Sequence, residues 1–307
     1  MKQDFAPIVL FVYNRPYHTQ MTLEALQKNS LASESELFIY SDAPKNDGAK
    51  EKVEQVRRYI KTINGFKKVT IIERDTNWGL ANSIIDGATK ILNEYGRIIV
   101  LEDDLVTSPF FLNFMNSALE TYESRDDIFS VTGFSFSSSF MRFPKHYNHD
   151  VYLNYRPMSW SWGTWKSRWD NIDWNIKDYA EFISDKTKIK MFHKGGTDLS
   201  RMLQMQMEGK LDSWYIRWSY NALLNDNLTV YPTLSYVNNI GHDNSGVHCG
   251  VDKNNIYSHK ELNVSQKCRM EKNLTINPTI VRHFNKAFNI KLKSKIKLAI
   301  KKLLALT

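Results

Sequence analysis

Four short runs of mainly apolar residues, rich in β-branched side chains, recur along the first third of the chain. They occupy residues 7–13, 37–40, 69–73 and 98–101. Short apolar runs without polar alternation are typical of strands that are covered on both faces. Each run is followed by a segment in which apolar residues recur at helical spacing, as over residues 80–91. Four consecutive strand–helix units predict an α/β fold with a largely parallel sheet and right-handed crossovers.

The fourth predicted strand runs directly into three acids, Glu102, Asp103 and Asp104. Open α/β sheets bind ligands at the carboxyl ends of their strands. Adjacent carboxylates repel one another and attract a cation, and ligand sets made only of oxygen favour a hard divalent ion such as Mg²⁺ or Mn²⁺. Such an ion would in turn bind a phosphate. Because an acidic turn can also be a solvated loop, its spacing alone leaves metal binding open.

The next helix is predicted to begin at Ser108 and Pro109. Serine is a preferred N-cap residue, and proline is favoured at the first helical position. The predicted strand, the acidic turn and this capped helix would form one structural unit.

The other predicted strands also end in polar or turn-forming residues. Asn14 and Arg15 follow the first strand, Asp42 follows the second, and Asn77 and Gly79 follow the third. Each of these residue types is common in ordinary turns. The carboxyl ends of parallel strands meet at one edge of a sheet, so we expect all of these residues to face one crevice together with the acids.

These features resemble a nucleotide-sugar glycosyltransferase of the GT-A fold, a Rossmann-like architecture, over roughly residues 5–250. The residues at the strand ends and the Asn77-x-Gly79 segment are similar to the corresponding segments of family 2 enzymes. The Glu102-Asp103-Asp104 form is closer to N-acetylglucosaminyltransferase I, which carries Glu-Asp-Asp where many relatives carry Asp-x-Asp. The resemblance implies a mixed, mostly parallel sheet flanked by helices in residues 1–270. Residues 1–125 would form the nucleotide-binding half and residues 126–270 the acceptor-binding half.

Three segments of the second half support this closer likeness. Residues 158–165 are similar in place and character to the Gly/Trp-containing acceptor-side segment of that enzyme. Residues 211–217 resemble its Trp-Asp-Asp-Trp-Met-Arg segment, in which an aspartate is the catalytic base. Residues 240–248 resemble the loop that closes over its donor.

The resemblance assigns a role to each polar residue of the crevice. Asp104 would ligate Mn²⁺ or Mg²⁺, while Glu102 and Asp103 would serve the ribose hydroxyls or metal-bound water. Asp42 would accept a hydrogen bond from the uracil ring of a UDP-linked donor. The remaining nucleotide-sugar contacts would be Asn14, Arg15, Asn77 and Gly79.

Asp212 is the candidate catalytic base, because the attacking acceptor hydroxyl must lose its proton to a positioned carboxylate. By the resemblance, sugar transfer would be direct and inverting. Asp212 also precedes a helical segment and can be an N-cap, a role compatible with an ionised base at a helix N-terminus. His248 is a candidate metal or phosphate contact, although an isolated histidine is more often structural.

Residues 156–169 contain four tryptophans. Aromatic faces stack on the C–H faces of sugars, but aromatic residues also dominate protein cores. Trp165 and Trp169 are four residues apart, which favours a place in the core. Trp160 and Trp162 lie beside Gly163 and are the candidate acceptor-binding residues.

The formal net charge of +8 comes entirely from the end of the chain. Beyond Lys272 the sequence contains eight basic residues and no acidic residue. The rest of the chain holds 33 basic and 33 acidic residues. Residues 271–307 are therefore predicted to be a basic tail with an amphipathic helix. An apolar stripe with a lysine-rich face is typical of a helix on an anionic membrane surface, but it also fits a solvated helix packed on the domain. The tail lacks the interleaved arginine and aromatic residues of nucleic-acid binders, so nucleic acid is not an expected partner.

Two cysteines without CxxC spacing indicate neither a disulfide framework nor a zinc site. We expect a cytoplasmic protein that associates peripherally with the inner face of the cell membrane.

The predicted activity is metal-dependent transfer of a sugar to a glycan or lipid-linked acceptor in surface polysaccharide synthesis. The alternatives are a carbohydrate-binding protein without activity and a metal-dependent nucleotidyltransferase. A nucleotidyltransferase would need a basic or Gly-rich segment to bind the triphosphate, and the sequence does not show one.

Overall fold

The computed structural model describes residues 5–243, 256–257 and 261–289. All four predicted strands are present, and each is followed by its predicted helix, with a 3-10 turn at Ala32–Glu34 before the second strand. The alternation of strand and helix expected from the apolar runs is therefore confirmed. The elements in chain order are β1 (Ile8–Val12), α1 (Pro16–Gln27), β2 (Glu36–Ser41), α2 (Asp47–Ile60), β3 (Lys68–Glu73), α3 (Gly79–Tyr95) and β4 (Arg97–Glu102).

The main sheet has eight strands in the order β3-β2-β1-β4-β8-β6-β9-β7. The first four strands of the chain run parallel to one another. Strand β8 is antiparallel to both of its neighbours, β6 is parallel to β9, and β7 is antiparallel to β9. The sheet is thus mixed and mostly parallel, as predicted. Its later strands are β6 (Ile128–Thr132), β7 (Val151–Asn154), β8 (Trp162–Trp165) and β9 (Leu228–Pro232).

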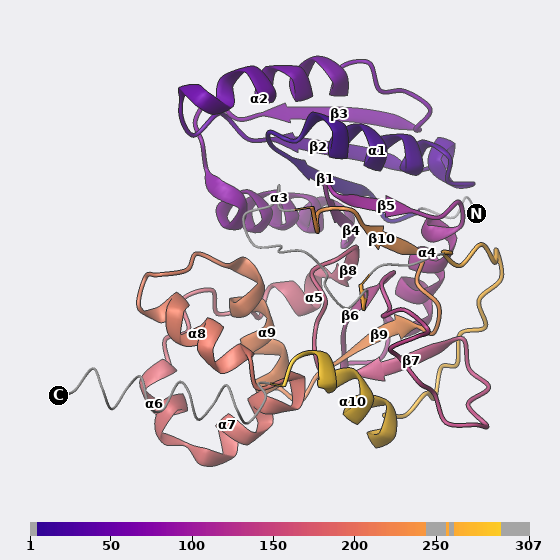
Figure 1. The fold of residues 1–307 in the computed structure, drawn as a ribbon, viewed down its shortest axis with the longest axis vertical. Coiled ribbons are helices and arrows are strands. Elements are labelled where there is room, and N and C mark those ends of the chain that lie inside the picture. The colour runs from indigo at the N-terminus through magenta and orange to yellow at the C-terminus, as the bar shows by residue number, and fades with distance from the viewer. Residues whose placement is uncertain (1–4, 244–255, 258–260, 290–307) are drawn as a thin grey trace.

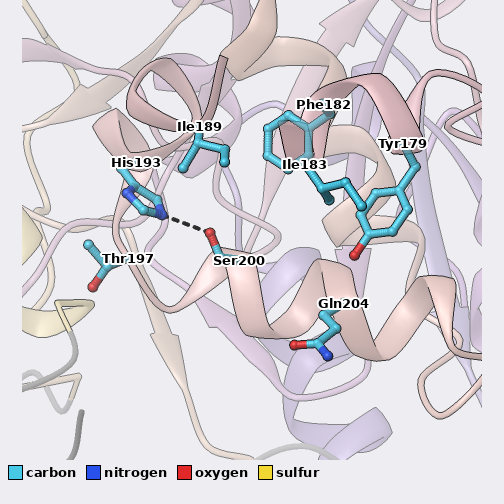
Figure 2. Close-up of a pocket in the computed structure, with 8 residues that line it drawn as sticks. All are labelled: Tyr179, Phe182, Ile183, Ile189, His193, Thr197, Ser200 and Gln204. Atoms are coloured by element: carbon cyan, nitrogen blue, oxygen red, sulfur yellow. Dashed lines mark hydrogen bonds between the residues drawn. The ribbon is translucent and has the colours of Figure 1, made fainter. Parts of the chain in front are cut away.

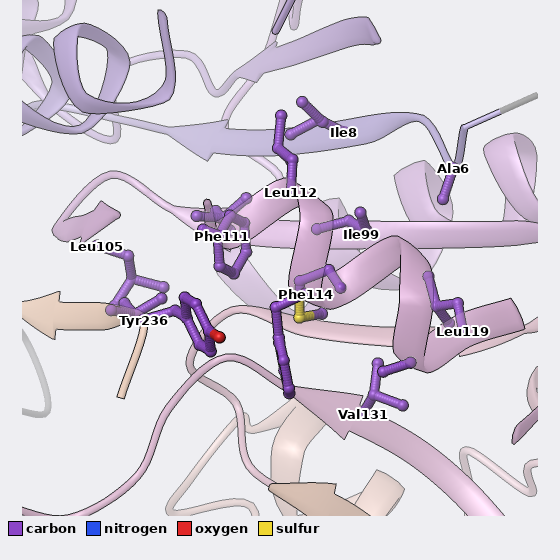
Figure 3. Packing of buried hydrophobic residues seen from close by; sticks show 14 of the residues in the cluster. Ala6, Ile8, Ile99, Leu105, Phe111, Leu112, Phe114, Leu119, Val131 and Tyr236 are labelled. Carbon is purple, nitrogen blue, oxygen red and sulfur yellow. The ribbon is translucent and has the colours of Figure 1, made fainter. Parts of the chain in front are cut away.

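Helices cover both faces of this sheet (Figure 1). Alternate residues of β1 belong to two different apolar clusters, because successive side chains of a strand point to opposite faces. One cluster joins the sheet to α1, α2 and α4 (Phe111–Tyr122), and Figure 3 shows Leu112 of α4 near Ile8 of β1. The other joins the sheet to α3, α5 (Lys166–Trp169) and α9 (Trp214–Leu224).

Two short strands outside the main sheet lie next to the acidic turn. Strand β5 (Leu105–Thr107) follows the acids and pairs antiparallel with β10 (Val237–Asn239), with Leu105 opposite Asn239. This pairing brings a segment more than 130 residues away in the chain to the carboxyl end of β4.

The start of α4 differs from the prediction. The helix begins at Phe111, and its capping residue Phe110 makes no side-chain cap. Ser108 instead extends the short ladder, because its backbone N–H donates to the carbonyl of Tyr236 at 2.8 Å. The N–H of Phe111 then donates to the Ser108 carbonyl in a turn before the helix. The prediction that Ser108 is the N-cap is therefore wrong, because Ser108 bonds to Tyr236, the residue just before the distant strand β10.

Further helices form a group that packs against α9. They are α6 (Tyr179–Ser184), α7 (Lys186–Phe192), the 3-10 turn His193–Gly195 and α8 (Leu199–Met207). Residues of α6, α7 and α8 surround Ile216 and Tyr220 of α9 in a separate apolar cluster.

Part of the predicted tail packs on the domain. Helix α10 (Pro278–Phe284) and the 3-10 turn Asn285–Ala287 follow the last described loop, and Ile280 and Phe284 are fully buried. The Phe288 ring lies 3.6 Å from the guanidinium carbon of the buried Arg156. Residues 278–288 of the predicted tail therefore pack on the domain, while the boundary at residue 271 stays a prediction. The predicted amphipathic helix beyond them lies outside the described residues, and none of the helices that are described is long and apolar enough to cross a membrane.

Candidate functional site

The acidic motif lies at the carboxyl end of β4, as predicted. Glu102 is the last residue of that strand, and Asp103 and Asp104 form the turn that leads into β5. The two aspartates are only 4% and 6% exposed. The backbone N–H of Ile240 donates to the Asp104 carbonyl at 2.9 Å, so the segment after β10 lies against the turn.

Arg15 reaches the same turn from the end of β1, which is the parallel neighbour of β4. Its Nη1 lies 3.0 Å from Asp104 Oδ2, and its Nη2 pairs with Asp103 Oδ1. The Arg15 carbonyl accepts from the backbone N–H and the hydroxyl of Thr19, which fixes the arginine backbone at the start of α1. The structure therefore brings Arg15 and the acids together, as the strand-end pattern predicted. Asn14 lies partly buried in the bend just before Arg15.

Burial and mutual repulsion shift the pKa values of this cluster. Burial, with the charges of Asp104 and Asp103, raises the pKa of Glu102 to about 8. Burial also raises the pKa of Asp103, although Arg15 opposes this shift. Burial works against the charge of Arg15, but the two aspartates outweigh it and raise the pKa of its guanidinium. The cluster therefore carries excess negative potential that one arginine balances only in part.

Asp42, at the end of β2, forms hydrogen bonds with the turn that begins α3. Its Oδ1 accepts from the backbone N–H groups of Ala43 and Trp78, both at 2.9 Å. Its Oδ2 accepts from Asn77 Nδ2 at 3.0 Å and from the N–H of Gly79 at 2.9 Å. Gly79 has a φ of +73°, a backbone conformation that glycine adopts without a steric cost. The predicted residues Asp42, Asn77 and Gly79 thus form one hydrogen-bonded unit at the sheet edge.

Trp78, in the middle of that unit, was not predicted as a site residue. Its side chain is 39% exposed, and the Arg74 guanidinium lies 3.9 Å from its ring centroid. Arg74 is in turn paired with Asp86 of α3, which fixes the guanidinium under the ring. The available signal was a large aromatic residue inside an otherwise polar turn.

Gly241 packs directly on the acidic motif. A Cβ atom at this position would lie 2.1 Å from Asp104 Oδ2 and 3.2 Å from Arg15 Nη1. No side chain fits there unless the turn moves. Two residues later, Asp243 Oδ2 lies 3.2 Å from His18 Nε2, which connects this loop to α1.

Trp160 also lies near the acidic motif. Trp162 pairs with Val100 in the antiparallel β8–β4 register, so Trp160, two residues earlier, is placed toward the carboxyl end of β4. Its half-buried ring packs against His242 and Tyr257, with centroid distances of 5.4 and 5.2 Å. Its role in acceptor binding stays a prediction.

Trp162 does not lie in a groove. Its side chain is 0% exposed and packs against Trp169, Trp214 and Trp218 in the core between the sheet and α9. This burial corrects the expectation for Trp162, because its ring has no face open to an acceptor.

Asp212 lies just before α9, but it is not the N-cap. The Ser213 hydroxyl accepts from the N–H of Ile216 and caps the helix. The Asp212 side chain is 63% exposed, and its Oδ1 lies 3.0 Å from Arg217 Nη2. The connection between α8 and α9 lies on the side of the molecule where α3 begins (Figure 1). Asp212 is thus accessible, and its role as the catalytic base stays a prediction. The other candidate, His248, lies outside the described residues.

A hollow of about 410 Å³ lies elsewhere, among α6, α7 and α8 (Figure 2). Tyr179, Phe182 and Ile189 form its apolar wall, and His193 Nε2 lies 2.7 Å from Ser200 Oγ. None of the predicted site residues lines it. The candidate site is therefore the cluster of polar residues at the carboxyl ends of the strands rather than this hollow.

The acidic turn fits a divalent cation that is shared with a phosphate ligand. Among the described residues, no group of three or more His, Cys, Asp or Glu side chains is arranged to hold a metal by itself. Mg²⁺ sites need no such cage, because they usually combine one or two carboxylates with water and substrate phosphates. Asp103 and Asp104 already hold a cationic group between them, which shows that the pair attracts positive charge.

The family assignment follows from the sequence. The model of "Glycosyl transferase family 2" matches residues 8–184, more than half of the chain, so the chain belongs to this family. The matched range contains β1 to β4, the acidic turn and Arg15. The predicted resemblance to family 2 is thereby confirmed. A comparison with curated proteins finds no match.

Solved structures with a related arrangement are distant. Two structures of S. aureus TarS match 75% of this chain, with TM-scores of 0.40 and 0.42 and identities of 11% and 12%. A Pyrobaculum calidifontis mannosyltransferase, PcManGT, in complex with GDP-Man and Mn²⁺ matches 43% of the chain, with a TM-score of 0.30 and 16% identity. The matches cover 59% and 36% of the two TarS chains and 38% of the mannosyltransferase chain, so this chain spans less than two thirds of each.

Proposed function

We propose that the chain is a metal-dependent, inverting glycosyltransferase that moves a sugar from a nucleotide sugar to a hydroxyl group of a glycan or lipid-linked acceptor. One observation carries the proposal. In a family 2 chain, two buried aspartates share one cationic group at the carboxyl end of a central parallel strand. Buried carboxylates at this edge are where the fold can hold a diphosphate together with its ion.

Asp104 and Asp103 would hold Mn²⁺ or Mg²⁺. When bound, such an ion supplies Lewis-acid stabilisation of the diphosphate leaving group. Gly241 packs against Asp104 Oδ2 at a position where a larger residue would displace the carboxylate. Arg15 can donate two parallel hydrogen bonds to phosphate oxygens, the geometry that guanidinium groups favour.

Asp42 and its turn would position the nucleoside. All four hydrogen-bonding directions of the carboxylate are used by the chain itself, and only Asn77 Nδ2 belongs to a side chain that can rotate away. A nucleobase N–H would therefore bind Asp42 by displacing the Asn77 amide. The exposed ring of Trp78 lies next to this position and offers a surface for stacking.

Asp212 would take the proton from the acceptor hydroxyl. Its carboxylate is open to solvent and precedes the N-terminus of α9, where the helix dipole favours the ionised form that a base needs. Trp160 would contact the acceptor sugar. The choice of UDP rests on the likeness to N-acetylglucosaminyltransferase I. We further propose that the protein is cytoplasmic and that its basic C-terminal segment binds an anionic membrane.

Calorimetric titration with UDP, GDP and dTDP tests this proposal. Each nucleotide is titrated in the presence of Mn²⁺ and again in the presence of EDTA, with the wild-type chain and with Asp104→Asn. We expect one nucleotide to bind with Mn²⁺ and to lose its affinity in EDTA and in the variant. Binding that ignores both metal and substitution would refute the metal site, and retained glycan affinity without nucleotide binding would support a carbohydrate-binding protein.

A further inference from the structure

Arg15 occupies a position that a bound cation would need. Its guanidinium contacts one oxygen of Asp103 and one of Asp104, and in the part of the chain that the structure describes it is the only basic side chain paired with either. The arginine side chain is 17% exposed, and the two aspartate side chains are 6% and 8% exposed. Ion pairs that are this shielded are screened far less by salt and water than pairs on the surface.

The backbone on both sides of these pairs is fixed. Thr19 donates two hydrogen bonds to the Arg15 carbonyl, and the Thr22 hydroxyl donates to the Asp103 carbonyl at 2.9 Å. Helix α1 thus holds both the arginine and the acidic turn at a constant separation. The contact can therefore be broken by rotation of the Arg15 side chain, without movement of either backbone.

We propose that Arg15 competes with the divalent cation for Asp104, so that the nucleotide-free protein binds the metal weakly. This inference rests on the proposed function, because it concerns the same metal site. The Asp104 Oδ2 atom that lies 3.0 Å from Arg15 Nη1 cannot also ligate an ion at the 2.0–2.1 Å typical of Mg²⁺ without repelling the guanidinium. Gly241 packs against the same oxygen, which leaves the two cations little room to coexist.

The competition couples metal binding to donor binding. A nucleoside diphosphate offers Arg15 new oxygens to pair with, and guanidinium groups bind phosphate in a bidentate manner. Once Arg15 turns to the diphosphate, Asp104 is released for the metal. The chain then assembles its full cation site only when the donor is present.

Manganese binding without nucleotide tests the competition directly. Electron paramagnetic resonance measures free Mn²⁺ during titration of MnCl2 into the wild-type chain, Arg15→Gln, Arg15→Lys and Arg74→Gln, each with and without UDP. We expect Arg15→Gln to bind Mn²⁺ at least about tenfold more tightly than wild type without nucleotide, because it loses a charge-assisted pair. Arg15→Lys should bind with intermediate affinity, since a lysine ammonium cannot bridge two carboxylates as a planar fork does.

Arg74→Gln is the matched control. It removes an arginine paired with a carboxylate at the same sheet edge without touching the acidic turn, so its Mn²⁺ affinity without nucleotide should equal that of wild type. If Arg15→Gln binds Mn²⁺ no more tightly than wild type, the competition is refuted, while metal-dependent UDP binding by wild type leaves the proposed function standing. If no variant binds Mn²⁺ with or without nucleotide, both fail. Circular dichroism verifies the fold of Arg15→Gln, and Arg15→Lys decides the question should Arg15→Gln not fold.

Discussion

The backbone N–H of Gly79 donates to Asp42 Oδ2 at 2.9 Å, so one carboxylate joins the end of β2 to the first residue of α3. The same carboxylate accepts from Trp78, Asn77 and Ala43. Asp42 therefore organises the turn even when no ligand contacts it.

Asp42→Asn should destabilise the fold. The asparagine amide has an NH2 group in place of one carboxylate oxygen, so the two N–H groups that bonded to that oxygen lose their acceptor. We expect the free energy of unfolding to fall by about 2 kcal/mol. Urea denaturation measures it. Asp47→Asn is the control, because that side chain is 92% exposed and its pair with Lys50 should contribute less than about 0.5 kcal/mol. Equal urea midpoints for the two variants would show that Asp42 does not hold the turn.

The cluster of polar residues at the strand ends was predictable because local patterns determine it. The apolar runs of β1, β2 and β4 are buried on both faces, whereas β3 lies at the edge of the sheet and is only partly buried. Each run still marks its strand and the residue at which the strand ends. Parallel topology then places Arg15, Asp42 and Asp104 at one edge. The family match to residues 8–184 covers this same half of the chain.

The features that the sequence did not reveal depend on long-range contacts. Ser108 bonds to Tyr236 instead of capping α4, and only the pairing of β5 with β10 makes this possible. Phe288 is held under Arg156, so residues that look like the start of a charged tail belong to the core. Likewise, the contact between Gly241 and Asp104 joins two segments that no periodicity connects.

Gly241→Ala should weaken metal-dependent nucleotide binding. The new methyl group would lie 2.1 Å from Asp104 Oδ2, so the acidic turn or the loop after β10 must shift. We expect a loss of at least about tenfold in UDP affinity in the presence of Mn²⁺, measured by calorimetry, because small displacements of ligating groups are costly. Gly48→Ala serves as control, since its nearest neighbour would be an ordinary 3.5 Å contact with Asn46 Oδ1. Unchanged affinity in Gly241→Ala would mean that the acidic turn tolerates displacement.

Trp162→Ala should act on stability rather than on acceptor binding. The ring is fully buried among three other tryptophans, and removal of a large aromatic side chain from a core costs about 3–5 kcal/mol. Trp78→Ala provides the comparison, because its ring is 39% exposed and should cost about 1 kcal/mol. Thermal and urea unfolding report both values. A Trp162 variant that unfolds like wild type would argue against the core placement.

Asp212→Asn should lower turnover without changing donor affinity. The amide can keep a hydrogen bond to Arg217 but cannot accept a proton, so the base is lost while the turn before α9 is retained. With the nucleotide sugar that binds most tightly, we expect the rate of nucleoside diphosphate release to fall about 100-fold or more, and calorimetry to give the same Kd as wild type. Asp170→Asn is the matched control, because Asp170 is also an exposed aspartate paired with a basic residue, Lys166. A variant that keeps its turnover would remove Asp212 as the base, whereas equal losses of turnover and donor affinity would indicate that Asp212 binds the donor instead.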